Sequence, residues 1–145
     1  MSNRSVRARL LTAASTALLG AACAGNPAPG EPGYRFNLQG NYDVLISVQG
    51  MAFTGTAELN TAPGGAVTGE LRLTSPESVT ADLAGTVADS TFQFESTYTR
   101  SGGCDGALVG SGSIAPEGAG TSGDLDVADD CAGGLMEGSF ELSRP

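Results

Sequence analysis

The chain has 145 residues, no histidine and no tryptophan, and 16 acidic residues against 7 basic ones, which gives a formal net charge of −9 at pH 7. This charge repels phosphate backbones, so we expect no nucleic-acid partner. Without histidine or lysine the chain cannot build a Ser-His-Asp, Cys-His or Ser-Lys centre, so we expect a protein that is not an enzyme and needs no cofactor.

Residues 1–22 are typical of a secretory signal. Three arginines precede an apolar stretch from Leu10 to Gly20, and small residues follow before Cys23. The apolar stretch is about half of the ~20 residues that span a bilayer, which favours a cleaved signal over a transmembrane helix. Removal of the signal leaves four basic residues against sixteen acidic ones, a formal charge of −12. We therefore expect an exported protein.

The segment Leu18-Leu19-Gly20-Ala21-Ala22-Cys23 resembles the lipobox of bacterial lipoproteins, in which small residues precede a lipidated cysteine. The resemblance implies that Cys23 carries a lipid and that the membrane is a partner, which places the protein in the cell envelope. In a host with two membranes, Ala24 after the cysteine implies the outer one. The alternative is ordinary cleavage after Ala24, which would remove the cysteine.

Residues 23–39 are rich in Pro, Gly, Ala and Asn, with prolines at positions 27, 29 and 32. This composition predicts a flexible tether. Residues 40–145 are enough chain for one hydrophobic core but not for two. The sequence therefore predicts a signal over 1–22, a tether over 23–39 and one domain over 40–145.

Within this domain, apolar residues alternate with Thr, Ser, Asp, Glu and Gln, and turn residues separate the alternating stretches. A period of two predicts strands, and we count eight of them. The predicted inward residues, strand by strand, are Tyr42, Val44, Ile46 and Val48; Met51, Phe53, Ala57 and Leu59; Val67, Leu71 and Leu73; Val79, Ala81, Leu83 and Val87; Phe92, Phe94 and Tyr98; Leu108 and Ile114; Leu125 and Val127; Met136, Phe140 and Leu142.

The turns fix a register, because inward residues must pair with inward residues. Counting through the turns sets each inward glycine beside a bulky inward residue: Gly85 opposite Phe94, Gly112 opposite Phe94, Gly123 opposite Phe140, and Gly110 and Gly138 beside Leu125. This arrangement predicts a filled interior. We expect a soluble, all-β, eight-stranded antiparallel up-and-down barrel with a polar outer wall. A two-sheet β-sandwich is the alternative, since the same alternation allows it.

Two cysteines flank the predicted hairpin of the sixth and seventh strands. If the turn lies at 116–119, Ala115 pairs with Gly120, and counting back in register brings Cys104 opposite Cys131. Export permits a disulfide. For a loop of this length, the chain-entropy model gives about 3.5 kcal/mol of stabilisation. We expect a structural disulfide.

Four acids gather within seven residues at Asp124, Asp126, Asp129 and Asp130. Their oxygens make them a weak calcium candidate, although the spacing matches no calcium-loop motif. A charged strand edge that discourages pairing with another sheet is the favoured interpretation. No other metal site is predicted.

Gly40-Asn41-Tyr42 at the start of the domain and Gly138-Ser139-Phe140-Glu141-Leu142-Ser143-Arg144 at its end resemble the calycin barrels, the lipocalins and avidins. In lipocalins an arginine from the last strand packs over a tryptophan of the first strand and closes the barrel's base. The resemblance implies that Arg144 packs over Tyr42 in the same way. It also implies a carrier of a small apolar ligand.

Three functions follow as hypotheses. The first is a membrane-anchored, non-catalytic binding or structural module, with an envelope protein as partner. The second is a lipocalin-like carrier of a small apolar ligand, which the predicted filled interior disfavours. The third is a periplasmic protease inhibitor in which residues 26–39 would enter the cleft of the protease.

Overall fold

The computed structural model describes residues 25–145, so the predicted signal, Cys23 and Ala24 lie outside the described residues. Among the described residues, no helix is long and apolar enough to cross a membrane. The elements are β1 (Gly40–Val48), β2 (Met51–Thr61), β3 (Ala66–Ser75), β4 (Val79–Ala88), β5 (Thr91–Thr99), β6 (Asp105–Ile114), the 3-10 helix η1 (Pro116–Gly118), β7 (Gly120–Asp129) and β8 (Gly134–Ser143).

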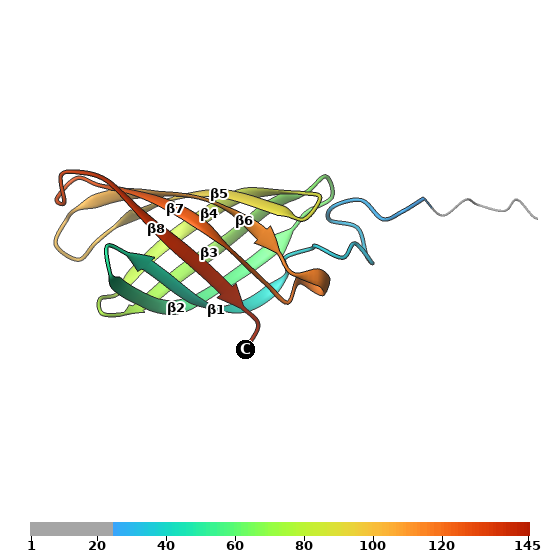
Figure 1. Cartoon of the computed structure of the whole chain (residues 1–145), viewed down its shortest axis with the longest axis horizontal. Helices are drawn as coiled ribbons and strands as arrows, with labels where there is room; N and C mark the ends of the chain where they lie inside the picture. Colours follow the sequence, from blue (N-terminus) through green and yellow to red (C-terminus); the bar gives the residue numbers. More distant parts are fainter. Residues whose placement is uncertain (1–24) are drawn as a thin grey trace, which may run out of the picture.

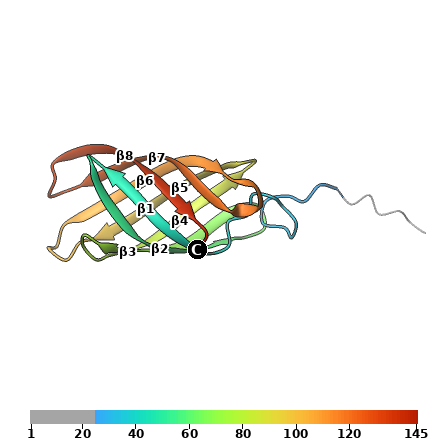
Figure 2. The ribbon, with the colours of Figure 1, turned by 60° about the horizontal axis from the view of Figure 1, so that its bottom comes forward.

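The eight strands form a closed antiparallel barrel (Figures 1 and 2). Each strand pairs with the next in the chain, and β8 returns to pair with β1 from Asp43↔Ser143 to Val48↔Gly138. The predicted up-and-down barrel is therefore confirmed. The alternative sandwich is wrong, because the pairing of the first and last strands leaves no open edge that would divide the wall into two sheets.

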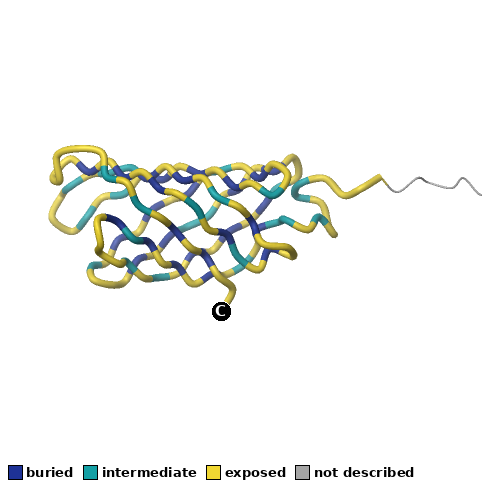
Figure 3. Tube along the Cα trace, in the orientation of Figure 1, coloured by how far each residue is buried: buried dark blue, intermediate teal, exposed yellow. Residues whose placement is uncertain are grey.

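Side chains alternate between buried and exposed along the strands, as a pleated wall around one core requires (Figure 3). Met51 is an exception, since it was predicted to face inward but is 57% exposed. It begins β2, next to a turn at one end of the barrel, where the interior meets solvent.

The paired residues agree with the predicted register in all but one case. Gly85 lies opposite Phe94 and Gly123 opposite Phe140, as predicted. Gly112 lies opposite Phe92, however, and Gly110 takes the predicted place opposite Phe94. The Arg100 N–H donates to the Cys104 carbonyl, so the turn is centred on Gly102, one residue earlier than the predicted pairing requires. A shift of two residues preserves the inward face, so the core residues are unchanged.

One end of the barrel is closed by the chain before β1. Leu38 is completely buried, its N–H donates to Thr61 Oγ1 at 3.0 Å, and that hydroxyl donates back to the Leu38 carbonyl at 2.8 Å. The Tyr34 hydroxyl donates to the Asp89 carbonyl at 2.7 Å. Composition predicted a flexible tether as far as residue 39, but its last part is docked, because Leu38 and two partly buried aromatic residues attach it to the core.

The same end carries the pair expected from the calycin resemblance. The Arg144 guanidinium lies 5.2 Å from the centroid of the Tyr42 ring, as predicted. The Tyr42 hydroxyl and Arg144 Nε both donate to the Gly118 carbonyl at 3.0 Å. Gly118 has a φ of 59°, and a Cβ there would lie 2.1 Å from the Asn37 carbonyl oxygen. The helix η1, the last residues of the chain and residues 34–39 are thereby joined into one closed end.

Candidate functional site

The other end of the barrel, the mouth, is formed by the turns at 49–50, 76–78, 100–104 and 130–133 (Figure 1). A cavity of about 310 Å³ extends from these turns into the barrel. Its wall is mainly aliphatic, with Ile46, Val48, Leu71, Leu73, Val79, Leu108 and Val127, and Met51, Phe53 and Met136 also line it. The predicted filled interior is therefore wrong for the mouth half of the barrel.

Three phenylalanine rings explain why the other half is filled. Phe92 and Phe94 stack with ring centroids 5.2 Å apart, and Phe140 meets Phe94 edge-on at 5.1 Å. All three lie nearer the closed end of their strands, whereas the inward positions toward the mouth carry mostly smaller aliphatic side chains. The aromatic residues therefore fill one half of the core and leave space in the other.

A group of polar side chains stands at the edge of this cavity, and we call Glu77, Tyr98, Arg100 and Asp129 the mouth cluster. The Asp129 side chain is only 2% exposed. Its Oδ2 accepts from the Tyr98 hydroxyl at 2.8 Å and from Arg100 Nη1 at 3.3 Å. Its Oδ1 accepts from the Cys131 and Ala132 N–H groups at 3.0 and 3.2 Å. Arg100 Nη2 pairs with Glu77 Oε1 at 2.8 Å.

These contacts fix the charges of the mouth cluster. Burial alone would raise the pKa of Asp129, but the hydrogen bonds from Tyr98, Cys131, Arg100 and Ala132 outweigh it, and the pKa is lowered. Burial, followed by the bond to Asp129, raises the pKa of Tyr98 far above neutrality. Hydrogen bonds to Glu77 and Asp129 raise the pKa of Arg100. The cluster therefore holds an ionised aspartate, a neutral phenol and a fixed cation.

The predicted disulfide is confirmed and lies at the mouth. Cys104 and Cys131 are joined with their Cα atoms 5.6 Å apart. Cys104 precedes β6 and Cys131 follows β7, so the bond ties the 100–104 turn to the 130–133 turn. The Cys131 N–H is also a donor to Asp129. The disulfide and the buried carboxylate together hold the 130–133 turn beside the cavity.

The four acids of the calcium candidate are not brought together. Asp124 and Asp126 point outward on β7, whereas Asp129 points inward. Successive side chains of a strand point to opposite faces, so residues an odd number of positions apart, such as Asp126 and Asp129, lie on opposite faces. Asp130 is exposed. Although Asp129 and Asp130 lie near Cys104 and Cys131, both sulfurs are in the disulfide and Asp129 already accepts four hydrogen bonds. This set of residues therefore does not form the predicted cation site.

Sequence reasoning missed most of the mouth cluster. It placed Tyr98 inward, but it assigned Asp129 to a charged strand edge. The alternation along β7 could have predicted that Asp129 points inward, because it lies on the same face as the buried Leu125 and Val127. Glu77 and Arg100 lie in turns, where alternation gives no direction.

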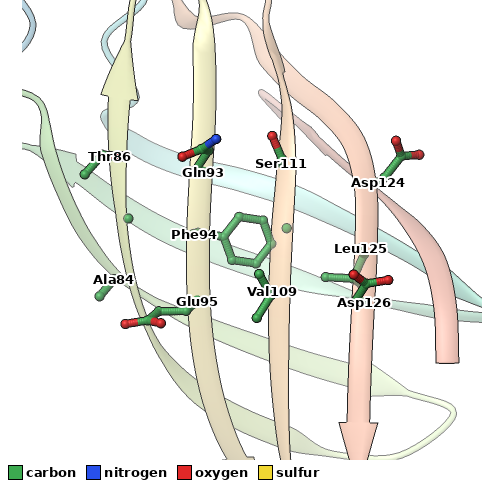
Figure 4. A pocket seen from close by; sticks show the side chains of 12 residues that line it. Ala84, Thr86, Gln93, Phe94, Glu95, Val109, Ser111, Asp124, Leu125 and Asp126 are labelled. Atoms are coloured by element: carbon green, nitrogen blue, oxygen red, sulfur yellow. The ribbon is translucent and has the colours of Figure 1, made fainter. Parts of the chain in front are cut away.

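A second and larger hollow, of about 630 Å³, lies on the outer wall across β4 to β7 (Figure 4). Its side chains include Glu95, Asp124 and Asp126, with the exposed Val109 between them. It is more open than the mouth cavity and carries carboxylates without a basic partner among its lining residues. These are the features of a solvated wall, so the mouth cavity is the better candidate site.

No protein-family model and no curated protein matches this chain. Among solved structures, the chain is similar to EF1p2_mFAP2b bound to DFHBI, with a TM-score of 0.58 and 12% sequence identity. The match covers 74% of this chain and 94% of the other. At this identity the similarity is one of fold alone, and it agrees with the calycin-like barrel that the two ends of the domain predict.

Proposed function

We propose that this barrel carries a small, mostly apolar molecule in the mouth cavity. The observation behind the proposal is the cavity itself: about 310 Å³, with aliphatic walls and a few convergent polar groups at its edge. These are the usual features of a small-molecule site, and the volume is near the lower end of the range for such sites. The carrier hypothesis is thereby favoured over a purely structural module.

Two further observations support a carrier. The closed end is occupied by Leu38, Tyr42 and Arg144, which favours access to the interior from the mouth. The solved structure with a similar fold, EF1p2_mFAP2b, is bound to a small molecule, DFHBI. Protease inhibition is disfavoured, because the 26–39 segment that would enter a protease is hydrogen-bonded to the barrel through Tyr34 and Leu38.

Adjacent residues on β6 supply a matched pair of variants. Leu108 lines the mouth cavity, and Val109 lies on the outer wall within the second hollow. In Leu108→Trp the larger side chain fills the cavity, whereas in Val109→Trp it projects into solvent. The probe is N-phenyl-1-naphthylamine, a neutral apolar dye whose fluorescence rises in an apolar site.

We expect the wild type and Val109→Trp to bind the dye, and Leu108→Trp to bind it at least about tenfold more weakly. Circular dichroism and a thermal melt establish that both variants fold. Unchanged binding by a folded Leu108→Trp variant would refute the mouth cavity as the site. Loss of binding in Val109→Trp alone would assign the dye to the outer wall.

We also propose that the protein is exported and held in the cell envelope by a lipid on Cys23, with the membrane as its partner. Support comes from the signal-like residues 1–22, and the disulfide accounts for the other two cysteines of the chain. Because residues 25–39 reach the barrel at its closed end, a lipid at Cys23 would direct the mouth away from the membrane (Figure 1). Cys23→Ser should move the protein from the membrane fraction to the soluble fraction, and retention in the membrane would contradict the proposal.

A further inference from the structure

We infer that the ligand is an apolar molecule with a protonated amine at one end, and that the amine meets the mouth cluster at Glu77. This inference rests on the proposed function, because it names the chemical class of the molecule in the mouth cavity. It distinguishes an apolar amine from a fatty acid, which has the same kind of tail but the opposite charge.

Besides the N–H donors of Arg100 and Gln49, the cavity edge offers a ligand two hydrogen-bond acceptors, at Tyr98 and Glu77. The Tyr98 hydroxyl gives its only proton to Asp129, so the phenol oxygen has only lone pairs left to offer a ligand. Glu77 pairs with Arg100 through Oε1, and Oε2 has no partner within residues 25–145. A ligand that donates hydrogen bonds therefore finds acceptors at Tyr98 and Glu77.

The charge of the mouth cluster also favours a ligand that donates hydrogen bonds and carries a positive charge. Arg100 is its single cation and already pairs with two carboxylates, Asp129 and Glu77. With both acids ionised, the cluster has a formal charge of −1. Asp129 is buried and holds four hydrogen bonds, so the partly exposed Glu77 is the carboxylate that a ligand can reach.

The surroundings of the mouth do not reverse this charge. Within the described residues, two of the other basic side chains, Arg35 and Arg144, belong to the closed end. The third, Arg72, lies on the outer face of β3 in the mouth half of the barrel, where it pairs with Glu70 and so adds no net charge. Asp105 and Asp130 add negative charge beside the 100–104 and 130–133 turns. An incoming amine is therefore attracted, and a carboxylate meets like charges.

The test uses three probes with the same ten-carbon tail: decylamine, 1-decanol and decanoate. Each is titrated into the full-length protein by calorimetry at neutral pH and low salt. We expect decylamine to bind about tenfold more tightly than decanol, and decanoate to bind about tenfold more weakly than decanol. The neutral alcohol reports on the cavity, and the two charged probes report on the mouth cluster.

Glu77→Gln assigns the effect to one carboxylate. In this variant the ratio of decylamine affinity to decanoate affinity should fall at least about tenfold, while decanol binding is unchanged. Glu95→Gln, which removes a carboxylate from the outer wall, is the matched control and should leave the ratio unchanged.

The outcomes separate the two proposals. If decanol binds but decanoate binds as tightly as decylamine, the inference about the amine is wrong and the carrier proposal stands. An unchanged ratio in Glu77→Gln also overturns the assignment to Glu77. If no probe binds to the wild type, the carrier proposal fails together with the inference.

Discussion

Shortening Leu38 to alanine is expected to lower the free energy of unfolding by about 3 kcal/mol. The Leu38 side chain is fully buried in the core at the closed end. Replacing a buried leucine by alanine costs about 2–5 kcal/mol, because apolar contacts are lost and a cavity remains. The chain before Leu38 is not a strand of the barrel wall and can move partly into the space, which favours a value in the lower half of that range.

Urea denaturation followed by circular dichroism measures this change, and the slope of the unfolding free energy against urea should be the same in both proteins. Leu135→Ala is the control, because Leu135 is 69% exposed on β8 and should change stability by less than about 0.5 kcal/mol. Thr61→Val keeps the size of the side chain but removes both hydrogen bonds between its hydroxyl and Leu38, at a cost of about 1–3 kcal/mol.

The reasoning is refuted if Leu38→Ala is as stable as the Leu135→Ala control. That result would mean that residues 34–39 leave the barrel in solution and behave as the flexible tether that their composition suggests. The closed end would then lack its cover, and access to the interior from the mouth alone would no longer follow.

Three other predictions concern the mouth and the closed end. Cys104→Ser should lower the free energy of unfolding under oxidising conditions by about 3.5 kcal/mol in the chain-entropy model, and an unchanged melting temperature would show that the bond adds no stability. Asp129 has a lowered pKa in the folded state, so its contribution to stability is complete above its unfolded pKa, near 4, and is lost as the pH falls through the folded value. Asp129→Asn should therefore destabilise the protein at pH 7 by about 2 kcal/mol and reduce the loss of stability on acidification, whereas parallel stability curves for the two proteins from pH 7 to pH 3 would contradict this. Arg144→Gln removes the cation over Tyr42 and should speed amide hydrogen exchange at η1 and the start of β1, while equal protection in the two proteins would argue against the closure.

The barrel wall was predictable because its rules are local. Alternation along one strand defines its inward face, and a short turn transmits that parity to the next strand. The disulfide followed from the same counting, because the turn after β6 sets Ala115 beside Gly120 and so brings Cys104 to Cys131. The error at Gly112 arose because the turn at 100–104 is centred on Gly102, one residue earlier than the predicted pairing assumed, which shifts the register by two residues.

The docked segment before β1 could not be derived from composition. Proline and glycine dominate the average over residues 23–39, yet Tyr34, Phe36 and Leu38 determine how its last part behaves. Whether such side chains are buried depends on an unfilled space at the end of a barrel, and that space exists only after the strands have closed. By contrast, the number of strands, their inward faces and the disulfide follow from local sequence patterns.

The mouth was decided by the tertiary structure alone. Sequence patterns predict which residues point inward, but they do not predict how much space the closed wall encloses at each height along the barrel axis. Three phenylalanines fill one half of the interior, and the aliphatic side chains of the other half leave a cavity of about 310 Å³. Glu77, Arg100 and Asp129 come from separate parts of the chain, and the pairing of β4 to β7 in the wall brings their side chains together. The all-β class is a property of local periodicity, whereas closure into a barrel depends on the long-range pairing of β8 with β1, and the candidate site is a property of the volume so enclosed.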